Sequence, residues 1–98
     1  MIKYNISIFV ENSIEEQTIK ALTQHLVPEL NQWDFIEQAH VFEISSHQEP
    51  DSKGFSIQCL IPASEERRKD SIETLISTFF LEEFPNKFVY FPSQLRRL

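Results

Sequence analysis

Two stretches of the chain alternate apolar and polar residues so regularly that both predict β-strands. The alternation runs from Tyr4 to Val10 and again from Phe55 to Ile61, within the segment 53–62. A strand of this kind buries one face of a sheet and leaves the other face half polar. We expect these two strands to lie at the centre of one sheet. Their half-polar face then carries Asn5, Ser7, Phe9, Ser56, Gln58 and Leu60.

One helix is predicted after the first strand. Its apolar residues occupy one broad arc, as in a helix that lies on a sheet. Pro28 lacks an amide hydrogen and its ring clashes with the carbonyl four residues earlier, so we expect a kink there or an end near Val27. The arc contains Ile14, Ile19, Ala21, Leu22, Leu26 and Leu30, and two pairs at its start have capping-box spacing, Asn12 with Glu15 and Ser13 with Glu16.

A second helix is predicted after the segment 53–62. Ser64 or Asp70 is expected to cap its first turn, and the dipeptide Pro85-Asn86 is expected to end it. Its spacing again predicts an apolar stripe that faces a sheet. The stripe contains Ile72, Leu75, Ile76, Phe79, Phe80 and Phe84.

Two further strands are expected at 35–46 and 87–91. The polar segment 45–53 has the residues of a turn, which predicts a hairpin between the second strand and the central strand that follows it. The register of the second strand stays open, because two sets of apolar residues compete for its inner face. These sets are Ala39 and Val41 on one side, and His40, Phe42 and Ile44 on the other.

The order of elements is therefore strand, helix, strand, strand, helix, strand. Right-handed crossovers place the first and third strands at the centre of a four-stranded antiparallel sheet, with both helices on one face. This is the ferredoxin-like βαββαβ arrangement, of class α+β. With 98 residues and no linker or repeat, residues 1–98 are expected to form a single domain.

The second face of this sheet has no cover within the chain. Aromatic residues of the outer strands add to it whichever register they take, and a monomer that exposes such a surface tends to associate. We therefore expect a two-fold homodimer in which two sheets face each other, a dimeric α+β barrel, with Leu95 and Leu98 docking on the partner. The groups lining a cavity between the sheets either bond one another, water and the partner, or orient a small-molecule ligand. They are Asn5, Ser7, Ser56 and Gln58.

Charge and composition exclude several classes of function. The formal net charge is −6, and nucleic-acid binding depends on Lys and Arg, so we expect no nucleic-acid partner. Gly54 is the only glycine, which excludes a phosphate-binding loop and a dinucleotide fingerprint. No apolar run approaches the roughly 20 residues that cross a bilayer, so no membrane association is expected. A single cysteine and no leader-like start favour the cytoplasm.

Candidate catalytic and metal-binding groups are scattered. His25 and Glu29 lie four apart and would share a helix face, but no third ligand accompanies them, and His40 and His47 complete no set. Cys59 alternates with apolar residues and is expected to be a buried, unreactive thiol. We therefore predict no metal site, no cofactor and no catalytic residue.

Four segments together resemble a known family of small bacterial proteins. They are Tyr4-Asn5-Ile6, His25-Leu26-Val27-Pro28-Glu29, Phe55-Ser56-Ile57-Gln58 and Phe88-Val89-Tyr90-Phe91, in matching order along nearly the whole chain. The chain in this respect resembles the domain of unknown function 4286. The resemblance implies a dimeric α+β barrel, and it implies no activity.

Two functions remain as hypotheses. The first is a non-catalytic dimeric module that binds a small molecule or a protein partner across the open sheet face. The second is a small cofactor-independent enzyme, an oxygenase, isomerase or lyase, that uses the cavity between two sheets. The second hypothesis needs a titrating group in that cavity, and His40 is the candidate if its strand directs it away from the helices.

Overall fold

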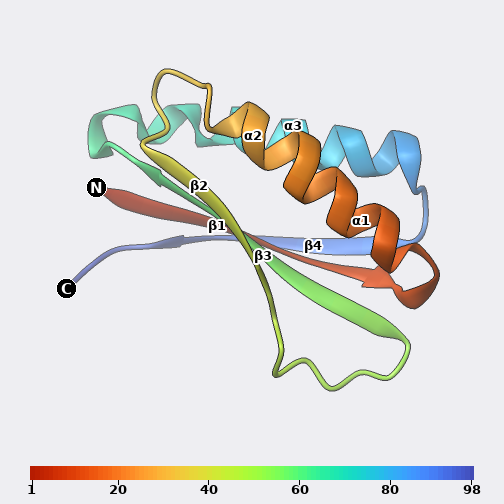
Figure 1. Ribbon diagram of the computed structural model, residues 1–98. Helices are drawn as coiled ribbons and strands as arrows, with labels where there is room; N and C mark the ends of the chain where they lie inside the picture. The colour runs from red at the N-terminus through yellow and green to blue at the C-terminus, as the bar shows by residue number, and fades with distance from the viewer.

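The computed structural model describes residues 1–98. The chain forms an antiparallel sheet with all helices on one face (Figure 1). The strand order is β2-β3-β1-β4, so the two strands with the clearest alternation lie at the centre, as predicted. All three strand pairs are antiparallel, which confirms the ferredoxin-like α+β fold. The strands are β1 (Ile2–Glu11), β2 (Gln38–Glu43), β3 (Ser52–Ile61) and β4 (Phe88–Leu95).

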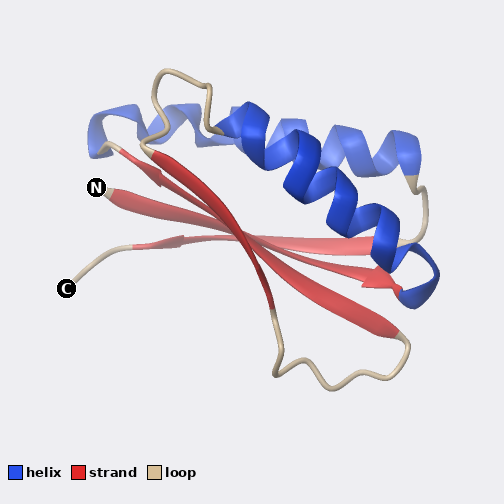
Figure 2. Cartoon of the chain, viewed as in Figure 1, coloured by secondary structure: helices blue, strands red, loops and turns tan.

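The helices form two segments along the chain, and Figure 2 shows them on one side of the sheet. None of the helices is both long and apolar enough to span a membrane. The first segment comprises η1 (Asn12–Ile14), α1 (Glu15–Ala21), η2 (Leu22–Leu26) and α2 (Val27–Leu30), and the second comprises η3 (Ala63–Arg68) and α3 (Lys69–Glu83).

Pro28 does not end the first helical segment. The five residues of η2 form a π-helical turn directly before it, and the chain stays helical to Leu30, which is fully buried. A π-helical turn bonds residues five apart, so the helix can continue past a residue that has no amide hydrogen to give. The expected end near Val27 is therefore wrong.

Both predicted helix caps are also wrong. Each helical segment begins with a 3₁₀ turn, and no side chain caps either start. The amide of Glu15 donates to the backbone carbonyl of Asn12. This amide is therefore already hydrogen-bonded and does not require a side-chain acceptor. The Asn12 side chain instead donates to the carbonyl of Pro50, at 2.8 Å, in the loop between β2 and β3. Neither Ser64 nor Asp70 caps the second segment.

The core lies between the sheet and the helices. Alternate residues of β1 and β3 are buried there, and Ile72, Ile76 and Phe80 of α3 pack on them with no exposed surface. Ile19 departs from the predicted arc, because 39% of its surface is exposed. The sheet contributes Ile2, Tyr4, Ile6, Ile8 and Val10 from β1, and Phe55, Ile57, Cys59 and Ile61 from β3.

The structure settles the register of β2. Ala39 faces the helices and is buried, whereas His40 and Phe42 point to the other face and are exposed. The strand is shorter than the predicted range 35–46. β4, by contrast, runs past Phe91 to Leu95, because Pro92 lies on an edge strand, where a missing amide hydrogen is tolerated.

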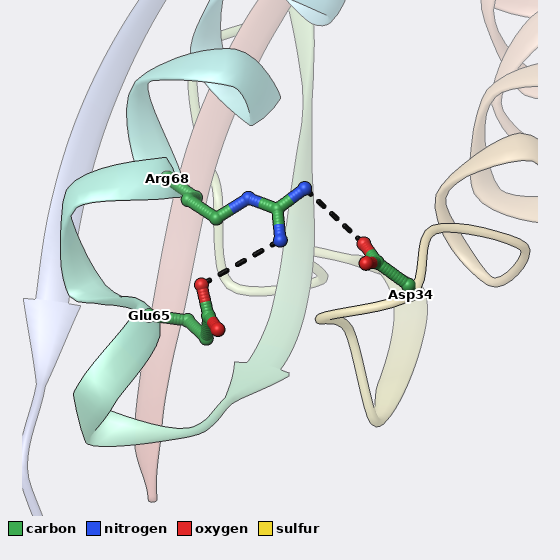
Figure 3. A network of polar contacts seen from close by, with 3 residues as sticks. All are labelled: Asp34, Glu65 and Arg68. Atoms are coloured by element: carbon green, nitrogen blue, oxygen red, sulfur yellow. Dashed lines mark ion pairs between the residues drawn. The ribbon is translucent and has the colours of Figure 1, made fainter.

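Arg68 connects the loop before β2 to the second helical segment (Figure 3). Its guanidinium lies 3.2 Å from the carboxylate of Asp34 and 3.6 Å from that of Glu65. The same group lies over the ring of Phe35, 4.2 Å from its centroid. These ion pairs are on the surface, where each adds little to stability. Phe35 belongs to the core, so the guanidinium of Arg68 covers one edge of the core.

Candidate functional site

The face of the sheet away from the helices, called here the open face, is arranged in rows that cross all four strands. In the ladders, Asn5 of β1 lies opposite Gln58 of β3 and Ser93 of β4, and Gln58 lies opposite His40 of β2. The next row joins Phe42, Ser56, Ser7 and Phe91 in the same way.

The centre of the open face is a connected polar network. Asn5, only 9% exposed, donates from Nδ2 to the hydroxyl of Ser7 at 3.0 Å and to that of Ser93 at 3.3 Å. Its Oδ1 accepts from the hydroxyl of Ser56, and Ser56 Oγ accepts from Nε2 of Gln58 at 3.1 Å. The four predicted residues therefore bond one another.

Sequence reasoning missed Ser93 because the last strand was expected to stop at Phe91. The alternation in fact continues through Phe91, Ser93 and Leu95, and this signal could have placed Ser93 beside Asn5. The hydroxyls of Ser7 and Ser93 accept from Asn5 and donate to no protein acceptor. These donors, and the Oε1 of half-buried Gln58, are therefore free to bind a ligand.

Apolar side chains border the polar network on both outer strands. Phe42 is 51% exposed, and Val89 and Phe91 of β4 are 56% and 59% exposed. Phe9 meets Phe91 edge to face, with ring centroids 6.0 Å apart, and it also meets His47, at 4.8 Å. Tall aromatic side chains thus stand on either side of short serine and asparagine side chains.

Gly54 makes room for one of these rings. It lies directly opposite Phe9, and a Cβ at this position would be 2.8 Å from the Phe9 ring and 3.3 Å from Cβ of Ile44. The single glycine of the chain therefore serves a close approach of an aromatic side chain to a strand.

The histidines fall in three separate places. His40 is exposed on the open face, with its ring centroid 6.2 Å from that of Phe42. His47 lies beside the Ser52 hydroxyl, with 2.8 Å between its Nε2 and that oxygen. His25 and Glu29 share one face, as predicted, and line a groove of about 430 Å³ between the two helical segments. No group of three or more His, Cys, Asp or Glu side chains is arranged to hold a metal ion.

Two buried groups behind the sheet are poorly suited to chemistry. Cys59 has no exposed surface, and burial raises the pKa of its thiol to about 12, so it stays protonated and unreactive. Tyr4 and Tyr90 both donate to the carboxylate of Glu73, at 3.4 and 3.3 Å. Burial of Tyr4 is the main cause that raises the pKa of its hydroxyl well above the usual range, and the negative charge of Glu73 is the second cause.

Comparison with known proteins gives a family and a fold. The family model described as Domain of unknown function (DUF4286) matches residues 1–98. Comparison with curated proteins gives no match.

Three similar solved structures cover almost the whole chain. The protein At3g17210 of Arabidopsis thaliana has a TM-score of 0.65 at 11% identity and covers 100% of this chain and 98% of its own. A conserved protein of unknown function from Bacteroides thetaiotaomicron, described as a possible oxidoreductase, has a TM-score of 0.61 at 14% identity, with 96% and 94% covered. Rv0793 of Mycobacterium tuberculosis has a TM-score of 0.59 at 11% identity, with 100% and 96% covered. At these identities the likeness shows the fold alone.

Proposed function

The chain belongs to the DUF4286 family of domains of unknown function, and we propose that it is a homodimeric, non-catalytic binding module. A second copy of the chain covers the open face, and a small molecule or a protein partner binds across that face. One observation carries the proposal: a hydrogen-bonded polar network lies between exposed aromatic side chains on a sheet face that no part of the chain covers.

The open face is large enough for a stable interface between two copies. Three of the four strands are eight to ten residues long. Because neighbouring strands lie about 4.8 Å apart, the open face spans on the order of 20 by 30 Å. A standard interface buries roughly 800 Å² on each partner, which a rough side-chain surface of this extent can supply. Because a two-fold axis brings the same patch of both copies together, the exposed Phe42 and Phe91 of one copy can pack on apolar groups of the other.

The heights of the side chains favour a hollow between the two copies. The row Phe42, Ser56, Ser7, Phe91 is tall at both ends and short in the middle. Sheets that pack face to face lie about 10 Å apart, and serine side chains are too short to fill that space. The hollow would be lined by Asn5, Ser7, Ser56 and Gln58. Its presence supports the ligand-orienting role proposed for these four residues.

Charge substitution on the open face tests the dimer. Phe91→Glu would place an unpaired carboxylate in each half of the interface, which costs several kcal/mol and raises the dissociation constant at least about 100-fold. Leu81→Glu is the matched control, because Leu81 is equally exposed, at 61%, but lies on α3 behind the sheet. Size-exclusion chromatography with light scattering should show a monomer for the first variant and a dimer for the second. Dimers of equal stability for both would refute this interface.

Native mass spectrometry of the gently purified protein tests the ligand. We expect a dimer that carries added mass, and loss of that mass in a Ser7→Ala/Gln58→Ala double variant that remains dimeric. An unchanged added mass in the double variant would remove the polar network from the proposal.

The second candidate is a cofactor-independent oxygenase, isomerase or lyase. It is favoured by His40, which is exposed on the open face in the row that contains Asn5 and Gln58. A base at this position would act on a substrate held by the network. Equal turnover by His40→Ala and wild-type protein, with any substrate found to react, would exclude this role.

The cytoplasm is the proposed location. The only cysteine is fully buried, so the fold depends on no disulfide and on no oxidising compartment. Cell fractionation tests this location.

A further inference from the structure

A cationic pocket lies at one end of the open face. Both ends of the chain lie at the same side of the sheet (Figure 1), next to the residues that line this pocket. β1 begins there and β4 ends there, because Lys3 is paired with Leu95 in the ladder. The pocket has a volume of about 550 Å³, which falls within the range of roughly 300–1,000 Å³ typical of small-molecule sites. It is lined by Met1, Lys3, Leu60, Leu95, Arg96 and Arg97.

The charge of this pocket opposes that of the whole chain. It holds three of the nine Lys and Arg residues and none of the fifteen Asp and Glu residues, although the net charge is −6. Both ion pairs of the structure belong to Arg68, so Lys3, Arg96 and Arg97 have no carboxylate partner. A concave site with one sign of charge concentrates ions of the opposite sign.

The walls between these charges are apolar. Lys3 lies between Leu60 of β3 and Leu95 of β4, its two partners in the ladders. Leu95 is 49% exposed and Met1 is 61% exposed, while Leu60 is half-buried. A ligand that satisfies both features carries an anionic head and an aliphatic tail.

From this arrangement we infer that the pocket binds an amphipathic carboxylate. The carboxylate pairs with Lys3, Arg96 and Arg97, and the tail covers Leu60, Leu95 and Met1. Lys3 and Leu60 each lie two residues from a member of the polar network, Asn5 and Gln58, so the pocket continues that network along the same face. The inference names the ligand class for the binding role proposed above and rests on it. All six lining residues belong to one chain, however, so the pocket itself does not require the dimer.

Isothermal titration calorimetry with hexanoate, octanoate and decanoate tests the ligand class. Each CH₂ group that becomes buried raises the affinity up to about fourfold, so the dissociation constant should fall along the series. Added salt should weaken binding, and decylamine, which has the same tail and the opposite charge, should bind far less. A series without chain-length dependence, or decylamine binding as tight as decanoate binding, would overturn the inference.

Two pairs of variants locate the site. Arg96→Glu/Arg97→Glu should weaken decanoate binding about tenfold or more, whereas Arg67→Glu, which reverses an exposed arginine outside the pocket, should leave it unchanged. Leu95→Asn should weaken binding, whereas Leu81→Asn on α3 should not. Equal effects of the pocket variants and their controls would refute the assignment.

The outcomes separate this inference from the proposed function. A dimer that carries added mass but does not bind decanoate would refute the amphipathic carboxylate and leave the binding module standing. Decanoate binding by a wild-type protein that is monomeric would support the pocket and refute the dimer. Cosedimentation with anionic lipid vesicles, without decanoate binding, would overturn the inference in favour of a membrane surface.

Discussion

The thiol of Cys59 makes the stability of this protein depend on pH in a way that can be calculated. The side chain is fully buried on the helix-covered side of β3, among the apolar residues of the core. Burial disfavours the thiolate and raises the pKa of the thiol from its ordinary 9.0 to about 12 in the folded protein.

The sign of the effect follows from proton binding. Below pH 9 the thiol is protonated in both the folded and the unfolded chain, so Cys59 adds no pH dependence. Above pH 9 the unfolded chain loses the proton while the folded chain keeps it. The free energy of unfolding therefore falls by about 1.4 kcal/mol for each pH unit, until the folded thiol also titrates near pH 12.

Urea denaturation of wild-type protein and of Cys59→Ala from pH 8 to pH 11 tests this value. Every other titrating group is common to both proteins, so the difference between the two curves reports Cys59 alone. The wild type should lose about 2–3 kcal/mol more than the variant over this range. Parallel curves would mean that the thiol is not buried as described, and so would rapid alkylation of native protein by iodoacetamide at pH 8.

Substitutions at three further positions test particular contacts by urea denaturation. Gly54→Ala should destabilise the fold by about 1–2 kcal/mol, because the added methyl group meets the Phe9 ring. The loss of stability should be smaller in a Phe9→Leu background, and an equal loss in both backgrounds would contradict this contact. Thr18→Val should stabilise the fold by about 1 kcal/mol, because the buried Thr18 hydroxyl has no hydrogen-bond partner, and a loss of stability would show that it has one. Asn86 has a φ of 64°, in the left-handed region. Asn86→Val should therefore lower the stability of the fold by about 1–2 kcal/mol, whereas Asn86→Gly should leave it unchanged. Similar losses for both variants would refute the left-handed turn.

Residue patterns predicted the sheet better than the helix termini. The alternation in β1 and β3 identified both central strands and the faces of their residues, because each strand has one face against the helices. The caps failed because 3₁₀ turns satisfy the first amides through the backbone, and a capping-box spacing cannot distinguish the two solutions. The helix end predicted near Val27 failed for a related reason, since the π-helical turn that accommodates Pro28 has no sequence signature.

The candidate site was only partly visible in the sequence. Asn5, Ser7, Ser56 and Gln58 could be placed on one face by alternation alone, but Ser93 was missed because Pro92 suggested that the last strand had ended. The cationic pocket could not be predicted, because Lys3 lies more than 90 positions from Arg96 and Arg97 and meets them only through the pairing of β1 with β4. The register of β2, and with it the direction of His40, depended on packing against the helices.

Sedimentation equilibrium of the wild-type protein tests the central claim most directly, because the proposed module requires a second copy on the open face. At micromolar concentrations we expect twice the mass of one chain, and a shift toward the mass of a single chain only on strong dilution. The mass of a single chain at every concentration would contradict the account, because Phe42, Val89 and Phe91 would then face water with no partner of their own kind.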